Sequence, residues 1–173
     1  MNIVLTGFMA TGKTQISKKL ANMLGYDLVD TDAVIVERTN MSINEIFEQN
    51  GEEYFREIEH DVICDVGKLD NTVISTGGGV VLNQKNIKEL RKNGIIVNLS
   101  PDFDVILERL SHAKDSRPLL KDSDIEGIHQ RFIDRLPYYA VCDYKIKVSN
   151  EYGPEHFAKE IVKLIQGWMS FKI

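Results

Sequence analysis

The sequence predicts an α/β protein of one domain, built as a three-layer α/β/α sandwich around a parallel β-sheet. The first observation is order, because short apolar runs alternate along the chain with stretches of helical periodicity. The second is that apolar runs such as Ile95-Ile96-Val97 are continuous, which is typical of strands covered by helices on both faces. The third is length, since 173 residues without a linker or an internal repeat suit a single domain spanning residues 1–173.

The expected elements follow from these patterns in chain order. Strands are expected at residues 2–6, 26–29, 72–76, 95–99 and 144–148, and helices at residues 12–24, 32–38, 42–49, 51–69, 84–93, 102–110, 124–136 and 154–168. The helix over residues 51–69 has the clearest pattern, because Phe55, Ile58 and Val62 recur at spacings of three and four. The last helix repeats this pattern with Phe157 and Ile161.

The loop after the first strand carries the most specific motif. Residues 7–14 read Gly-Phe-Met-Ala-Thr-Gly-Lys-Thr, which matches the phosphate-binding pattern G-x-x-x-x-G-K-[ST]. The apolar run Ile3-Val4-Leu5 precedes the motif and a helix-forming stretch comes after it, so the required order of strand, loop and helix is present. In such loops backbone N–H groups bind phosphate, the lysine (Lys13) reaches the outer phosphates and the hydroxyl (Thr14) ligates Mg²⁺. A chance glycine turn is the alternative, and the agreement of motif and context favours a nucleoside triphosphate site of the P-loop NTPase type.

Two carboxylates follow the second expected strand, in the sequence Val29-Asp30-Thr31-Asp32. Asp30 is placed to hold Mg²⁺, and Asp32 to accept a hydroxyl proton or bind a diol; from the residues alone, Asp32 could equally cap the helix that begins at Ala33. The third strand is followed by Gly77-Gly78-Gly79 instead of the aspartate that usually assists Mg²⁺, which favours Asp30 as the metal-supporting carboxylate. The glycines also permit close approach to a ligand, although a plain flexible turn explains them as well.

Three arginines are candidate ligands for phosphate or carboxylate groups, and each has an ordinary alternative. Arg56 stands three residues before Glu59, the spacing of a surface ion pair on a helix. Arg135 ends an expected helix, where a cation suits the helix dipole. Arg117 lies in a polar stretch that an ordinary surface loop would explain. If all three converge with Lys13, they form a cationic pocket suited to phosphates and a carboxylate.

The polar stretch over residues 111–124 interrupts the alternation of strands and helices. It contains Pro118 and has few side chains to bury. A surface loop is the simple interpretation, but phosphoryl transfer requires exclusion of water, so we predict a mobile lid.

Composition limits the partners and the compartment. The net charge is −5, which does not favour binding to nucleic acid or to an anionic membrane surface. No stretch approaches the length of a membrane span, and the chain opens without the basic region of a signal peptide. Cys64 and Cys142 form no C-x-x-C pair and are expected as small buried hydrophobes in a reducing cytoplasm. Without a heptad pattern, we expect a monomer.

With these residues in view, the chain resembles the shikimate kinase family over nearly its whole length. The resemblance rests on six motifs in order: Gly-Phe-Met-x-x-Gly-Lys-Thr from Gly7, Asp30-Thr31-Asp32, Gly51-Glu52-x-x-Phe55-Arg56-x-x-Glu59, Gly77-Gly78-Gly79, Arg117-Pro118-Leu119-Leu120 and Arg135-x-Pro137-x-Tyr139. It implies a five-stranded parallel sheet of order 2-3-1-4-5, like that of the nucleoside monophosphate kinases.

The resemblance also implies a role for each matching residue, with a substrate-binding region at about residues 32–61 and the lid at 111–124. The phosphates of ATP are wrapped by Ala10, Thr11, Gly12, Lys13, Thr14 and Gln15. Thr14 ligates Mg²⁺ and Asp30 supports it. Asp32 binds ring hydroxyls of shikimate and is the candidate base. Arg56, Gly78, Gly79 and Arg135 hold the substrate, and Glu59 orients Arg56. Lys13 and Arg117 stabilise the transferred phosphoryl group, while Arg109 and Arg117 contact the nucleotide, Arg109 near adenine.

The chain departs from the family pattern at two places. Ala10 replaces a frequent glycine, and we expect little effect on condition that its φ is negative. Residues 150–152 read Asn-Glu-Tyr and lack a basic residue that some relatives place near adenine.

The predicted activity is ATP-dependent phosphorylation of the 3-hydroxyl of shikimate in aromatic amino-acid (chorismate) biosynthesis. The alternatives are a gluconate- or nucleotide-kinase-like enzyme and a nucleotide-binding regulatory module without turnover.

Overall fold

The computed structural model describes residues 1–112 and 125–171, and the surroundings of side chains up to residue 167. The predicted lid at 111–124 therefore lies outside the described residues except for Ser111 and His112, which end helix α5. Arg117 also lies outside them.

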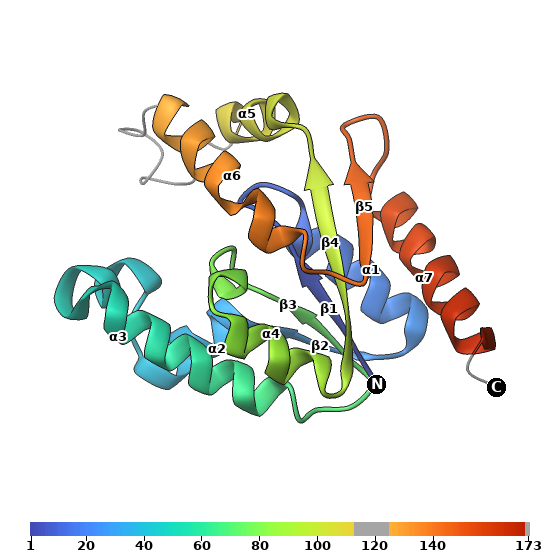
Figure 1. The fold of residues 1–173 in the computed structure, drawn as a ribbon, viewed down its shortest axis with the longest axis horizontal. Coiled ribbons are helices and arrows are strands. Elements are labelled where there is room, and N and C mark those ends of the chain that lie inside the picture. Colours follow the sequence, from blue (N-terminus) through green and yellow to red (C-terminus); the bar gives the residue numbers. More distant parts are fainter. Residues whose placement is uncertain (113–124, 172–173) are drawn as a thin grey trace.

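Five parallel strands form one sheet in the order β2-β3-β1-β4-β5, which confirms the predicted topology (Figure 1). The strands are β1 (Asn2–Thr6), β2 (Asp27–Asp30), β3 (Thr72–Ser75), β4 (Gly94–Pro101) and β5 (Tyr144–Val148). Val4 at the centre of β1 pairs with Ile74 on one side and Ile96 on the other. The P-loop therefore leaves the sheet from its middle strand, where neighbouring strand ends can contribute to one site.

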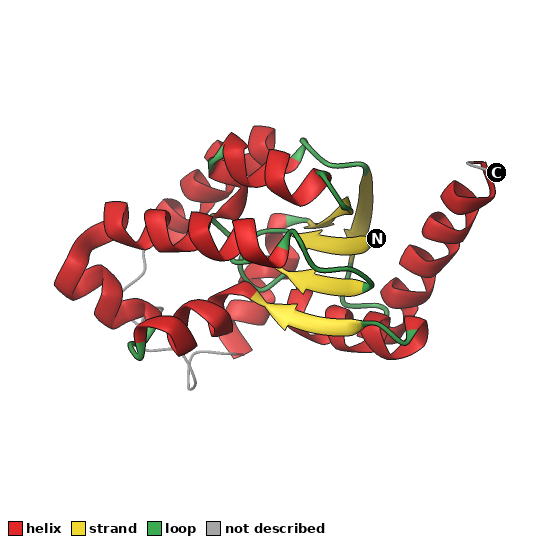
Figure 2. Ribbon diagram, turned by 90° about the horizontal axis from the view of Figure 1, so that it is seen from below, coloured by secondary structure: helices red, strands yellow, loops and turns green. Residues whose placement is uncertain are grey.

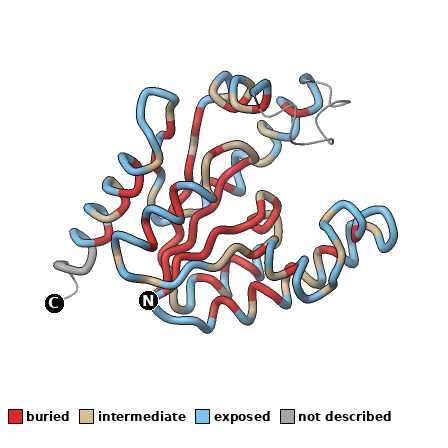
Figure 3. Tube along the Cα trace, turned by 180° about the vertical axis from the view of Figure 1, so that it is seen from behind, coloured by how far each residue is buried: buried red, intermediate tan, exposed pale blue. Residues whose placement is uncertain are grey.

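Helices cover both faces of the sheet, as Figure 2 shows. They are α1 (Lys13–Leu24), α2 (Thr31–Thr39), α3 (Ile43–Val66), the 3₁₀ turn η1 (Val80–Leu82), α4 (Gln84–Arg91), α5 (Phe103–His112), α6 (Ile125–Tyr139) and α7 (Pro154–Phe171). Side chains alternate between the faces of a strand, so Val4 packs with α2 to α6 while Ile3 and Leu5 pack with α1 and α7. The two resulting cores confirm the three-layer sandwich, and burial is densest along the central strands (Figure 3).

Helix α3 contains the two helices expected at 42–49 and 51–69, joined without a loop. The junction is Gly51, whose φ of 83° and ψ of 174° interrupt the helical path. Ser42 begins the first arm with a capping box, because its side chain accepts from the Glu45 backbone N–H and Glu45 accepts from the Ser42 N–H. The second arm ends at Val66, so the expectation that it reaches Leu69 was wrong.

Three further expectations need correction. Helix α6 continues through Pro137 to Tyr139, so Arg135 does not end the helix, and the dipole explanation for this cation fails. Strand β2 lies at the sheet edge, and Leu28 is 38% exposed, so this strand is not buried on both faces. Cys64 and Cys142 are free thiols, and both are half-buried instead of fully buried. Among the described helices, none is long and apolar enough to cross a membrane.

Candidate active site

One cleft of about 870 Å³ opens at the carboxyl ends of the strands. It gathers residues from the P-loop, from the segments that follow β2 and β3, and from helices α3, α5 and α6. Every predicted site residue that the structure describes lines it: Ala10, Thr11, Gly12, Lys13, Thr14, Gln15, Asp30, Asp32, Arg56, Gly78, Gly79, Arg109 and Arg135. Their spacing in the sequence does not show that these residues lie together, but the topology of the fold brings them into one cleft.

The P-loop contains residues in the left-handed conformation, and its backbone packs closely against a neighbouring strand. Gly12 has φ of 91°, and a side chain at Gly7 would lie 2.7 Å from the carbonyl oxygen of Leu99. Ala10 has φ of 58°, so the condition that its φ is negative is not met, and the substitution of alanine for glycine places a methyl group in the left-handed region. Lys13 Nζ donates to the carbonyl oxygens of Gly7 at 2.6 Å and Phe8 at 2.8 Å, which folds the lysine over the loop.

Arg109 of α5 connects the P-loop to the segment after β5. Its guanidinium donates to the Ala10 carbonyl at 3.1 Å and the Ser149 carbonyl at 3.1 Å, and its Nε donates to Asn150 at 2.8 Å. Asn150 also donates to Glu108 at 2.6 Å. Asn150, which the sequence offered only as a departure from the family pattern, is thus part of the scaffold beside the phosphate loop.

The two carboxylates at the end of β2 have different roles. Asp30 is the N-cap of α2, since its Oδ1 accepts from the backbone N–H of Asp32 at 3.0 Å and of Ala33 at 3.3 Å. The alternative that Asp32 caps this helix is therefore wrong, and the Asp32 carboxylate faces the cleft. Burial, together with the charge of Asp30, raises the pKa of Asp32 above its ordinary value, although Lys13 and Arg56 oppose the shift. A carboxylate with a raised pKa is a better proton acceptor.

The candidate metal ligands fit an ion that is held mostly by a bound triphosphate. Thr14 and Asp30 line the same cleft. In the described ranges no group of three or more His, Cys, Asp or Glu side chains forms a cage for a metal ion. Mg²⁺ is usually bound through one or two protein oxygens plus substrate phosphates, so a hydroxyl and a carboxylate are a suitable donor set.

Arg56 and Glu59 form an ion pair with a buried carboxylate instead of the ordinary surface pair that their spacing allows. Arg56 Nη1 donates to Glu59 Oε1 at 2.8 Å, and the Glu59 side chain is only 2% exposed. Arg56 also contacts Glu52 at 3.2 Å, on its solvent side. Burial disfavours the charged form of both partners. At Glu59 burial outweighs the attraction of Arg56, so the pKa of Glu59 is raised. At Arg56 the two carboxylates, Glu59 and Glu52, outweigh burial, so the pKa of Arg56 is also raised.

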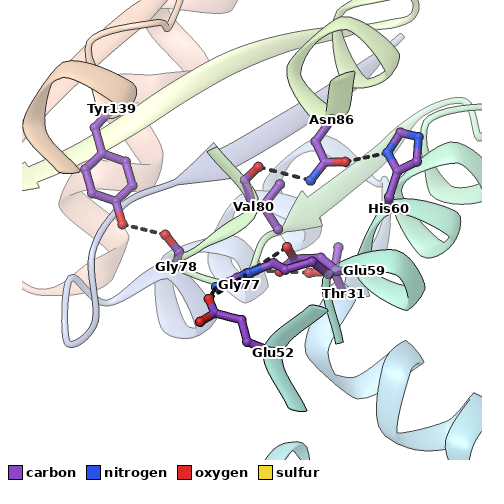
Figure 4. Close-up of polar contacts among 10 residues, drawn as sticks. Thr31, Glu52, Glu59, His60, Gly77, Gly78, Val80, Asn86 and Tyr139 are labelled. Carbon is purple, nitrogen blue, oxygen red and sulfur yellow. Dashed lines mark hydrogen bonds and ion pairs between the residues drawn. The ribbon is translucent and has the colours of Figure 1, made fainter. Parts of the chain in front are cut away.

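The glycine loop after β3 is held from neighbouring elements (Figure 4). The Gly77 N–H donates to Thr31 Oγ1 at 3.0 Å, and the Tyr139 hydroxyl donates to the Gly78 carbonyl at 2.6 Å. Neither the Gly78 N–H nor the Gly79 N–H has an acceptor within the described part of the chain. Two backbone donors are therefore available at the cleft, beside the arginine of α3.

Arg135 approaches the same place from α6. Its guanidinium lies 5.9 Å from the centre of the Phe8 ring in the P-loop, at cation–π distance. Arg56 of α3 and Arg135 of α6 thus line the same cleft as Asp32 and the P-loop. This arrangement gives a cationic end that suits a carboxylate, next to a carboxylate that suits a hydroxyl.

A family model described as shikimate kinase matches residues 9–166. The chain belongs to the shikimate kinase family. Among curated relatives, the shikimate kinases of Caldanaerobacter subterraneus subsp. tengcongensis and Caldicellulosiruptor bescii are each 47% identical, over 163 and 164 residues, and in both cases 94% of this chain and 94% of the relative are covered. The membership confirms the predicted class of enzyme, an ATP-dependent kinase that uses Mg²⁺.

Solved structures of shikimate kinases agree with this fold. The enzyme from Bacteroides thetaiotaomicron has a TM-score of 0.88 at 31% identity, covering 96% of this chain and 98% of that chain. The enzyme from Acinetobacter baumannii, solved in complex with shikimate, has a TM-score of 0.86 at 33% identity, covering 96% and 93%. A gluconokinase from Sinorhizobium meliloti, at 16% identity and a TM-score of 0.68 over 99% of this chain and 96% of that chain, shares the fold alone.

Sequence reasoning missed several residues in and around this cleft. Thr31 has no predicted role of its own in the Asp30-Thr31-Asp32 motif, yet its buried hydroxyl accepts a hydrogen bond from the glycine loop. Ile43 and Phe47 give the cleft an apolar wall, and Tyr152 and Pro154 line it near Arg109. The sequence did contain a signal for a role of Thr31, because this residue lies between the two aspartates at the end of a strand. No sequence signal marked Ile43 and Phe47 as lining a cleft, since apolar residues spaced four apart on a helix ordinarily pack in the core.

Proposed function

We propose that this chain transfers the terminal phosphoryl group of ATP to the 3-hydroxyl of shikimate, giving shikimate 3-phosphate and ADP. The observation that carries the proposal is that Asp32 shares one cleft with a P-loop and a pair of arginines. A hydroxyl that binds at Asp32 is then in the same cleft as the phosphate donor and the groups that bind a carboxylate. The product supplies aromatic amino-acid (chorismate) biosynthesis.

In this mechanism the P-loop holds the donor. The residues from Ala10 to Gln15 surround the phosphates of ATP, and Lys13 leaves the carbonyl oxygens of Gly7 and Phe8 to stabilise charge on the phosphoryl group. Arg117, in the segment outside the described residues, adds a second positive charge. Thr14 and Asp30 hold Mg²⁺, which supplies charge neutralisation at the phosphates when it is bound.

The acceptor half of the site works by position and proton acceptance. Arg56 and Arg135 bind the carboxylate of shikimate. The Gly78 and Gly79 N–H groups, which have no acceptor among the described residues, bind oxygens of the substrate. Asp32 orients the 3-hydroxyl and takes its proton as the oxygen attacks phosphorus in line with the leaving ADP. The raised pKa of Asp32 supports this step, because burial makes its carboxylate a stronger base.

We also infer that the chain acts as a cytoplasmic monomer that does not bind nucleic acid. The net charge of −5 supports the last point, since its sign disfavours binding to a polyanion. Static light scattering at micromolar concentration tests the monomer, and a dimer mass would contradict it.

A coupled assay for ADP release tests the proposed activity. We expect ADP formation with shikimate, ATP and Mg²⁺, little with gluconate or nucleoside monophosphates, and a shikimate 3-phosphate signal in the ³¹P spectrum. Activity on the other acceptors without activity on shikimate would contradict the proposal. Nucleotide binding with no ADP production under saturating shikimate would point to a regulatory module instead.

A further inference from the structure

Tyr139 is the last residue of α6 and has no role in the proposed phosphoryl transfer. Its side chain lies in the core and the residue is only 5% exposed, yet its hydroxyl reaches the edge of the active-site cleft. There it donates to the carbonyl oxygen of Gly78 at 2.6 Å. A buried tyrosine hydroxyl ordinarily has a hydrogen-bond partner, so the existence of a bond here says little. The identity of the partner, a carbonyl of the glycine loop, is what indicates a role.

The hydrogen bond fixes a peptide unit of the glycine loop. A peptide is planar and trans, so the carbonyl of Gly78 and the N–H of Gly79 point in opposite directions from one rigid plane. Tyr139 binds the carbonyl and thereby sets the direction of the N–H, which has no acceptor within the described residues. Glycine residues restrict their backbone dihedral angles very little. A contact from another element, here the Tyr139 hydroxyl, therefore fixes the orientation of this peptide.

An arginine of the acceptor half meets the same glycine. Tyr139 and Arg135 are four residues apart on α6, and a Cβ at Gly78 would lie 3.7 Å from the Tyr139 hydroxyl and 3.8 Å from Arg135 Nη1. A phenol donates one hydrogen bond and can accept others, so it can bind a carbonyl and a guanidinium at once. Burial raises the pKa of Tyr139 to about 12, so the hydroxyl keeps the proton that it donates to Gly78 at neutral pH.

We propose that Tyr139 is a positioning residue that fixes the Gly78–Gly79 peptide and Arg135 in one frame, so that the groups binding the acceptor's carboxylate are assembled before substrate arrives. This inference rests on the proposed function for the identity of the acceptor. It concerns two elements that are distant in sequence, the loop after β3 and the end of α6. Tyr139 acts through these groups and does not itself touch the substrate.

The test compares Tyr139→Phe with Tyr138→Phe. Tyr139→Phe keeps the ring and its packing and removes only the hydroxyl. Tyr138 is the neighbouring residue of α6 and is 42% exposed, so Tyr138→Phe removes the same atom where it does not reach the loop. Purified variants are assayed well below their Tm, with KM for shikimate, KM for ATP and kcat determined separately. The ¹⁵N order parameters of the Gly78 and Gly79 amides are measured by NMR without substrate.

We expect Tyr139→Phe to raise KM for shikimate about tenfold, the change that corresponds to roughly 1.4 kcal/mol. KM for ATP should stay within about twofold, and the order parameters of the two glycine amides should be lower than in the wild type. Tyr138→Phe should match the wild type in all of these. A residue with only a packing role would lower Tm without this split between the two substrates.

Unchanged KM for shikimate in Tyr139→Phe, or equal increases in both KM values, would overturn the inference. Unchanged order parameters at Gly78 and Gly79 would overturn its physical basis. A wild-type enzyme that forms no ADP with shikimate would contradict the proposed function instead, and the comparison of order parameters would then still decide whether Tyr139 orders the loop.

Discussion

Gly77 lies directly against the carboxylate of Asp32, such that a Cβ at Gly77 would stand 2.5 Å from Asp32 Oδ1. The same relationship recurs two residues later, where a Cβ at Gly79 would stand 2.4 Å from Arg56 Nη1. The glycine loop is therefore shaped to leave space for two side chains that we propose act on the acceptor. Space, more than backbone freedom, explains these two glycines.

Gly79→Ala should displace the Arg56 guanidinium and weaken the binding of shikimate. The clash involves the end of a flexible side chain, so the fold should tolerate it and Tm should change little. Loss of a charge-assisted contact of this kind corresponds to an increase in KM for shikimate of roughly tenfold or more. Steady-state kinetics with each substrate varied in turn measures the effect.

Gly167→Ala is the matched control for Gly79→Ala. A Cβ at Gly167 in α7 has no atom within 4 Å, so the added methyl group should leave both KM values unchanged. An unaltered KM for shikimate in Gly79→Ala would show that Arg56 needs no space at this glycine, or that Arg56 does not bind the substrate.

Asp32→Asn should reduce kcat by about 10² to 10⁴ while leaving nucleotide affinity nearly unchanged. The amide keeps the shape of the side chain but cannot take the proton of the attacking hydroxyl. Rapid-quench or coupled kinetics gives kcat, and titration with a fluorescent nucleotide analogue gives the affinity. Turnover close to that of the wild type would exclude both a base role and an essential positioning role for Asp32.

The same substitution should stabilise the folded protein at neutral pH. Burial raises the pKa of Asp32 above 3.8, so the folded state binds this proton more tightly than the unfolded state does. The stability of the wild type then falls as pH rises from about the ordinary aspartate value through the raised one. Asparagine carries no charge, so Asp32→Asn should have the higher Tm at pH 7 and lose this advantage below about pH 4.

Calorimetry over this pH range, with the exposed residue Asp61 replaced by asparagine as control, measures the effect. The control should show no such gain at neutral pH. A Tm difference between Asp32→Asn and the wild type that is independent of pH would mean that the charge of Asp32 is not its cause.

The fold was predictable because its signals are local in sequence. Continuous apolar runs such as Ile95-Ile96-Val97 indicate central strands, and the P-loop pattern identifies the loop and the helix that come after β1. The edge strand β2 was harder, since Leu28 and Val29 look like a buried run although Leu28 is exposed. The order of the strands came from the family resemblance, because no local pattern records which strands are neighbours.

The site was predictable in its residue types and less so in their burial and partners. The spacing of Arg56 and Glu59 is the same in a surface pair and in a buried one, and only the packing around Glu59 distinguishes them. Tyr139 could not be connected to Gly78 from sequence, because 61 positions separate them. From the sequence, either Asp30 or Asp32 could be the N-cap of α2. In the structure the cap is Asp30, whose backbone is extended and whose side chain accepts from the N–H groups of Asp32 and Ala33.

Arg56→Ala should mainly weaken shikimate binding, with KM for shikimate raised by about 10- to 100-fold and KM for ATP little changed. It should also destabilise the protein, because Glu59 then loses the cation that is bound to it in a buried position. Kinetics and thermal unfolding measure the two effects. Arg38→Ala, which breaks an exposed pair with Asp65, is the control and should leave both nearly unchanged. An effect of Arg56→Ala confined to KM for ATP would contradict the assignment.

Ala10→Gly should stabilise the protein, because Ala10 has φ of 58° and a left-handed alanine costs about 1 kcal/mol. Part of the gain is offset by the greater freedom of glycine in the unfolded chain, so we expect a rise in Tm of about 2 °C. Gly25→Ala is the reverse experiment, since Gly25 has φ of 65° and a Cβ there meets no atom within 4 Å. Its Tm should fall by a similar amount. Differential scanning calorimetry compares the two, and a lower Tm for Ala10→Gly would mean that contacts of the Ala10 methyl group outweigh its backbone strain.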